Sequence, residues 1–132
     1  MKNEEIILPE EFNHIDNNWF WNIVSEANED EEKLKEILFK MEKEEIYKFK
    51  DLFLEAAVEL QYEPFTNFTE ESEDGIEDIS FWVVSKGKRY YNEIVNNPEK
   101  TPYSVEGKLD IILAYAADIV YEEKYNERLD LY

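Results

Sequence analysis

The stretch SEDGIEDISFWVVSKGKRYYNEIVNNP, residues 72–98, decides the fold because it joins an acidic helix start to an apolar run and an interior glycine. The Asp78 carboxylate can accept the free backbone N–H groups of a following helical turn, and Glu77 lies beside the positive end of that helix. Ile79, Trp82 and Val83 follow helical spacing. The same short window also fits a strand, so its period alone is ambiguous.

Gly87 and Pro98 punctuate the second half of this stretch. A helix that ends near Lys86, a glycine turn and a second helix that stops before Pro98 would use both residues in their usual roles. We therefore predict a helix over residues 78–96 that is kinked near Gly87, with a positive φ at Gly75 and at Gly87.

Three segments carry a family resemblance: residues 72–88, SEDGIEDISFWVVSKGK, residues 20–24, FWNIV, and residues 114–124, AYAADIVYEEK. The first resembles the signature S-D-D-G-F-x-D-F-R-x-W-L-I-x-x-G-R of a bacterial family known only as domain of unknown function 4240. The other two are similar to the opening F-W-x-L-I and the closing Y-V-A-x-E-V-Y-E-E-K of that family. Residues 63–71, EPFTNFTEE, depart from it, because the family has a longer apolar, glycine-rich passage there. The resemblance implies a common fold and brings no known activity.

The remaining apolar pattern is helical throughout. We predict further helices over residues 18–28, 31–42, 44–62 and 108–125, which makes the protein an all-α, single-domain bundle of about five helices. Residues 1–16 and 126–132 are expected to be loosely ordered within that one domain, residues 1–132. Three consecutive aromatics at residues 19–21 cannot share one helix face, so Trp19 or Trp21 should lie at the edge of the core.

Composition bears on where the protein is located in the cell and on whether the chain folds. The chain has 132 residues, a length that fits one domain, and no cysteine, which excludes disulfides and thiolate metal sites. The start MKNEEIILPEEF lacks the apolar core of a signal peptide, and no apolar run reaches the ~20 residues of a membrane span. We expect a cytoplasmic protein. A hydrophobic content of 43% argues against disorder.

Charge is the strongest compositional signal. The chain carries 33 acidic and 14 basic side chains, a formal net charge of -19. Such a surface repels nucleic acid and draws a basic protein by electrostatic steering. The alternative is that the acidity only keeps the protein soluble.

Residues 63–75 form the longest predicted loop, and Phe65 and Phe68 are expected to pin it to the core. Glu70, Ser72 and Asp74 mimic the first half of a calcium-binding loop. The twelfth position counted from Glu70 is a phenylalanine where that site needs a bidentate glutamate, so we predict no metal.

Catalytic motifs are not found in the sequence. It has no Gly-x-Ser-x-Gly elbow and no phosphate-cradling glycine loop, and its one histidine, His14, lies outside any predicted element. A carboxylate pair such as Glu73 with Asp78 can be drawn, but nothing singles it out among so many acids. We predict no catalytic residue and no cofactor.

The hypothesis that follows is a small acidic binding protein, not an enzyme, whose partner is a basic protein, as for an immunity-type protein or an inhibitor. Aromatic anchors and steering carboxylates should make the contact. An enzyme that uses paired carboxylates, with or without a divalent ion, and a helical scaffold subunit are the alternatives. The predicted partner-binding residues are Trp19, Glu70, Glu71, Glu73, Asp74 and Tyr91.

Overall fold

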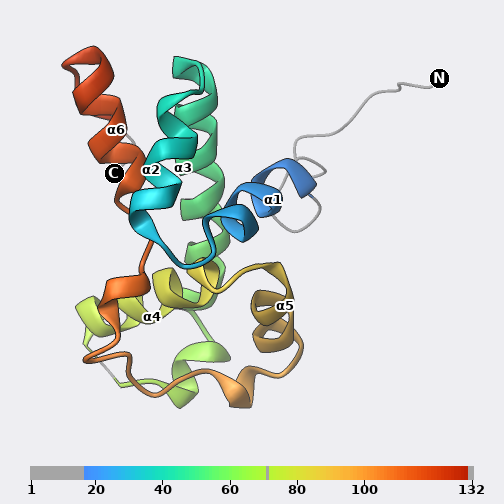
Figure 1. Ribbon diagram of the computed structural model, residues 1–132. Coiled ribbons are helices and arrows are strands. Elements are labelled where there is room, and N and C mark those ends of the chain that lie inside the picture. The colour runs from blue at the N-terminus through green and yellow to red at the C-terminus, as the bar shows by residue number, and fades with distance from the viewer. Residues whose placement is uncertain (1–16, 71, 131–132) are drawn as a thin grey trace.

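Helices account for all the regular structure in the computed structural model, which describes residues 17–70 and 72–130 (Figure 1). Within these residues there is no strand, so the all-α prediction is confirmed. Short 3-10 turns connect the longer helices at Glu59–Gln61, Phe65–Phe68, Pro98–Lys100 and Leu109–Ile111. The α-helices are α1 (Asn18–Ala27), α2 (Glu31–Phe39), α3 (Lys43–Val58), α4 (Glu73–Ser85), α5 (Lys88–Asn96) and α6 (Ala116–Tyr125).

The helices form two halves that share α3. In one half, α6 packs against α2 and α3, and Figure 1 shows the three side by side. The lower end of α3 enters the other half, where α4 packs against it and α5 packs against α4. α1 contacts both α2 and α3. The long helix α3 therefore belongs to both halves and connects them.

Side-chain caps fix the starts of the first helices. The Asn17 side chain accepts a hydrogen bond from Phe20 N at 3.0 Å, and Asp30 accepts from the amides of Glu32 and Lys33. Glu42 and Glu45 form a capping box at the start of α3. These caps satisfy amides that have no partner inside a helix, which is why acids and asparagines punctuate this part of the chain.

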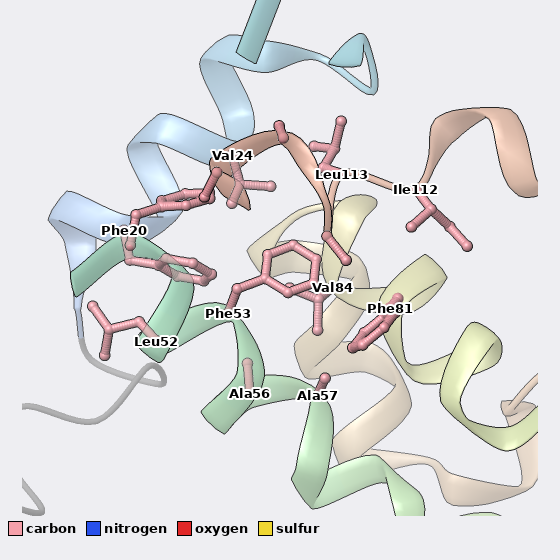
Figure 2. Close-up of a cluster of buried hydrophobic side chains, with 14 of the residues drawn as sticks. Phe20, Val24, Leu52, Phe53, Ala56, Ala57, Phe81, Val84, Ile112 and Leu113 are labelled. Atoms are coloured by element: carbon pink, nitrogen blue, oxygen red, sulfur yellow. The ribbon is translucent and has the colours of Figure 1, made fainter. Parts of the chain in front are cut away.

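The core is organised around the aromatic ring of Phe53 on α3. Figure 2 shows Phe53 between Phe20 of α1 and Phe81 of α4, and the ring centroids lie 6.2 and 5.9 Å from that of Phe53. Trp21 extends this aromatic row at one end, and Tyr115 extends it at the other. Trp21 is buried and Trp19 is half-buried, as the three consecutive aromatics require.

The last helix was predicted over residues 108–125, but α6 begins only at Ala116. The preceding residues, 112–115, are not helical, and Ile112, Leu113 and Ala114 are nevertheless buried. Ser85 Oγ accepts a hydrogen bond from Leu113 N at 2.9 Å, and Lys50 Nζ donates to the carbonyl oxygen of Ala114. Side chains of α3 and α4 thus satisfy backbone groups that a helix would have satisfied, and Leu109 remains exposed.

The start of α4 also differs from the prediction. Ser72 is the cap, since its Oγ accepts from Gly75 N at 2.9 Å, and Asp78 lies inside the helix. The predicted positive φ at Gly75 is wrong because this glycine belongs to the first turn of α4. Residues 78–96 are divided between α4 and α5, which are separated by Lys86 and Gly87.

The two ends of the chain are described only in part. Residues 126–130 were predicted to be loosely ordered. Leu129 is buried in the structure, and the carboxylate of the exposed Glu127 lies 3.0 Å from Lys43 Nζ. The predictions for residues 1–16, for His14 and for residues 131 and 132 lie outside the described residues.

The backbone at Gly87 gives a direct test of the α4 to α5 junction. Gly87 has φ 108° and ψ 172°, a region that only glycine occupies readily. A valine here is expected to lower the free energy of unfolding by more than about 1 kcal/mol, because its Cβ clashes with its own backbone. No neighbouring atom lies within 4 Å of a Cβ at this position, so the cost would come from the backbone alone. Urea denaturation measures it.

Arg89→Val is the matched control, because it places the same side chain two residues later in ordinary helical geometry. We expect it to cost only a few tenths of a kcal/mol, roughly. Equal costs for the two substitutions would show that Gly87 has no special backbone role.

Candidate functional site

The predicted steering carboxylates lie together at the start of α4. Glu73 and Asp74 are exposed in the first helical turn, which Ser72 caps. Glu70 is half-buried just before it, and its backbone N–H donates to the carbonyl oxygen of Tyr103 at 3.0 Å. A Cβ at Gly75 would come within 2.7 Å of Glu70 Cδ, so the Glu70 side chain lies over this turn. Glu71 lies outside the described residues.

Tyr91 cannot be the exposed anchor that the sequence suggested. It is fully buried on α5, its hydroxyl donates to the carbonyl oxygen of Ala56 at 2.8 Å, and its ring centroid lies 5.2 Å from that of Trp21. Burial raises the pKa of the Tyr91 hydroxyl, with the nearby Glu59 carboxylate acting in the same direction. The residue joins α5 to α3 because its hydroxyl is satisfied inside the core.

Trp19 is half-buried on α1, and Lys48 Nζ lies 5.4 Å from the centroid of its ring. In Figure 1, α1 and the beginning of α4 lie on opposite sides of the molecule. The structure therefore does not bring Trp19 together with the predicted carboxylates.

A shallow groove lies beside the first turns of α4, and we call it the acidic groove. It has a volume of 340 Å³. Its lining consists of three acidic residues, one tyrosine, one glutamine and one isoleucine. The lining residues are Gln61, Tyr62, Glu73, Asp74, Ile76 and Glu77.

Two exposed tyrosines border these carboxylates, and the sequence did not single them out. Tyr62, in the wall of the groove, is 66% exposed, and Tyr103, which meets the backbone of Glu70, is 65% exposed. Tyr62 was placed at the end of a helix predicted over residues 44–62, although α3 stops at Val58. Its position next to the acidic loop is the signal that could have marked it. Phe68 in that loop is also exposed at 41%, whereas Phe65 is buried.

Two titratable groups near the groove, Asp78 and Tyr115, have raised pKa values. The pKa of the Asp78 carboxyl is raised by desolvation first, and then by the like charges of Asp74 and Glu70. Desolvation also raises the pKa of the Tyr115 hydroxyl, and Glu77 and Asp78 act in the same direction. The neighbouring carboxylates thus add to the desolvation in raising both pKa values.

Lys50 and Asp118 form an ion pair in which the lysine is buried. Lys50 Nζ on α3 lies 2.8 Å from Asp118 Oδ2 on α6 and 5.5 Å from the centroid of the Tyr115 ring. The Lys50 side chain is completely buried, while that of Asp118 is 26% exposed. Desolvation lowers the pKa of the Lys50 ammonium, and Asp118 opposes this shift. The pair therefore holds α3, α6 and residues 112–115 in one arrangement.

Together, the fold and the groove define an all-α acidic domain with aromatic residues exposed among its carboxylates. A family model described as "Protein of unknown function (DUF4240)" matches residues 15–127. The chain belongs to this DUF4240 family, as the three sequence segments suggested. Neither a curated protein nor a solved structure matches the chain.

Residues 17–70 and 72–130 contain no group of three or more histidine, aspartate or glutamate side chains placed to hold a metal ion. No helix among them combines the length and the apolar character that crossing a membrane requires.

The Lys50–Asp118 pair predicts an unequal response to removal of either partner. Asp118→Ala should lower the free energy of unfolding by about 3 kcal/mol or more, because the buried ammonium loses its counter-charge. Lys50→Met should cost less, about 1 to 3 kcal/mol, because the Ala114 carbonyl oxygen loses its donor while the Asp118 carboxylate that remains is partly exposed to water. Urea denaturation at neutral pH compares the two variants, and equal losses would contradict the asymmetry.

Raising the pH provides a second readout. A lysine whose pKa is lowered by folding binds fewer protons in the folded state than in the unfolded one, so stability rises with pH between the two pKa values. Removing Asp118 takes away the main interaction that opposes the lowered pKa of Lys50. Asp118→Ala should therefore regain stability relative to the wild type as the pH rises toward about 9, below the range of tyrosine ionisation.

Proposed function

We propose that this protein binds a basic protein surface through the acidic groove and the exposed tyrosines beside it. The observation that carries the proposal is the position of Tyr62 and Tyr103, each about two-thirds exposed, next to Glu70, Glu73 and Asp74. Tyrosine offers a large contact area at low cost in conformational entropy, and it is enriched at protein interfaces.

The two kinds of residue would act at different stages of binding. Exposed carboxylates on a chain of net charge -19 accelerate the encounter with a cationic partner, and salt screens this effect. A tyrosine that loses water at the interface acts mainly on the dissociation rate. Trp19 remains a predicted contact residue, but the groove does not depend on it.

An acidic domain that covers a basic functional surface would block it. We therefore propose an immunity-type or inhibitor role, in the cytoplasm and without chemistry of its own. The partner is identified by affinity capture from native cells followed by mass spectrometry, and a neighbouring toxin gene would point to the same pair. A carboxylate enzyme would instead respond to divalent ions in a thermal shift measurement, and a scaffold subunit would return only neutral or acidic partners.

Neutralising the carboxylates tests the steering role. With the captured partner, Glu70→Gln, Glu73→Gln and Asp74→Asn in one variant should lower the association rate about tenfold at low salt, because the encounter loses its electrostatic attraction. The wild-type rate should itself fall steeply toward physiological salt. Stopped-flow or surface-based kinetics provide the measurement.

The matched control removes three exposed carboxylates elsewhere on the surface, with Glu26→Gln, Glu36→Gln and Glu122→Gln in one variant. It changes the net charge equally and leaves the groove intact, so the association rate should change much less. Equal effects of the two variants, or a rate that salt does not alter, would show that the acidity serves solubility alone.

The tyrosines are tested by dissociation. Tyr62→Ala and Tyr103→Ala should each raise the dissociation rate about tenfold, which corresponds to about 1.4 kcal/mol of binding free energy. Tyr47→Ala removes another exposed tyrosine, 43% exposed on α3, and should leave the rate unchanged. Unchanged dissociation in all three variants would contradict an interface at the groove.

A further inference from the structure

A second hollow differs from the acidic groove because the charge of its lining is positive. This cleft has a volume of 330 Å³ and lies between α1 and the junction of α4 and α5. Lys88 Nζ donates to Asn18 Oδ1 at 3.2 Å, and Lys86 Nζ lies 3.4 Å from Glu29 Oε2, so side chains link the two walls. Figure 1 shows the α4 to α5 connection passing beside α1. The volume is at the lower end of those found for small-molecule sites.

Basic residues are concentrated on the wall of this cleft. Lys86, Lys88 and Arg89 all line it, and residues 86–89 form the only four-residue window of the sequence that contains three basic residues. Among the described residues, Glu29 is the one acid in the lining, so the formal charge of this part of the lining is three minus one, or +2. Because the chain has a net charge of -19, its overall composition does not account for a positive cleft.

The three cations are held in different ways. Lys86 Nζ lies 5.1 Å from the centroid of the Trp82 ring and 6.0 Å from that of Tyr90, in addition to its contact with Glu29. Lys88 is held by its hydrogen bond to Asn18. Arg89 is exposed and makes no ion pair with any of the described residues. Two cations are therefore positioned in advance, and the exposed Arg89 lies beside them.

Neutral donors complete the cleft. Gly87 is the N-cap of α5 and has no side chain to accept the amides of the first turn. Asn18, Asn22 and Asn28, whose side chains carry amide donors, also line the cleft. Amide donors beside fixed cations suit an oxyanion, and the cations of the cleft add charge to the polarity of the helix start.

We propose that this cleft binds the phosphate group of a small molecule. A phosphate monoester carries a charge of about -1.5 to -2 at neutral pH, which matches a lining of +2, whereas a single carboxylate does not. The surrounding acidic surface repels an extended polyanion such as an anionic membrane or nucleic acid. A small phosphate compound can enter the cleft without bringing further negative charge against that surface.

Inorganic phosphate and glycerol 3-phosphate are the probes for this site. Titration of the isotopically labelled chain should shift the backbone amide signals of residues 87–90 in a saturable way. Chloride at the same ionic strength should not, and acetate should bind at least tenfold more weakly. Lys88→Gln with Arg89→Gln should weaken the binding of both probes at least tenfold, because two of the three cations are lost.

The control variant, Lys33→Gln with Arg128→Gln, also removes one exposed lysine and one exposed arginine, but neither lines the cleft. It should bind phosphate as the wild type does. Absence of saturable shifts, or equal weakening in both double variants, would overturn the proposal. Binding to vesicles that contain phosphatidylserine would overturn its restriction to small molecules. The amide spectrum of each variant also reports whether it is folded.

Discussion

The fold depends on how the buried backbone of residues 112–115 is satisfied. This segment lies outside any helix, yet Leu113 is fully buried and Ala114 is 2% exposed. Ser85 accepts from the amide of Leu113, and Lys50 donates to the carbonyl oxygen of Ala114. An unsatisfied amide or carbonyl group in this place would cost about 1 to 3 kcal/mol. One serine and one lysine, from α4 and α3, therefore make this buried position possible.

The same lysine links the core to the electrostatics of the surface. A buried ammonium must have a counter-charge, and Asp118 provides it from the first turn of α6. Tyr115 lies over Lys50 and contacts Phe81, so the ion pair is continuous with the aromatic row that crosses the core. Packed side chains therefore run from Asp118 on α6 through Lys50 and Tyr115 to Phe81 on α4.

The two surfaces proposed for binding use the same part of the chain. Four residues of the acidic groove, Glu73, Asp74, Ile76 and Glu77, lie inside the run that resembles the family signature. Lys86, Gly87 and Lys88 of the positive cleft lie in the same run. Tyr62 of the groove comes just before residues 63–71, where this chain departs from the family. Opposite charges keep the ligands of the two surfaces apart.

The sequence alone determined the helical class, the family and most helix positions, because caps and apolar periods of three and four residues are local signals. It also indicated the glycine at the α4 to α5 junction, whose backbone only glycine adopts readily. Only the tertiary structure decided that α6 begins at Ala116, that Tyr91 is buried and that Tyr62 stands beside the carboxylates. The first two depend on residues distant in sequence. Lys50 and Ser85 form hydrogen bonds to the backbone of residues 112–115, and the Ala56 carbonyl oxygen accepts a hydrogen bond from the Tyr91 hydroxyl. A local pattern cannot indicate such contacts, because burial and hydrogen bonding of this kind exist only after the helices have packed.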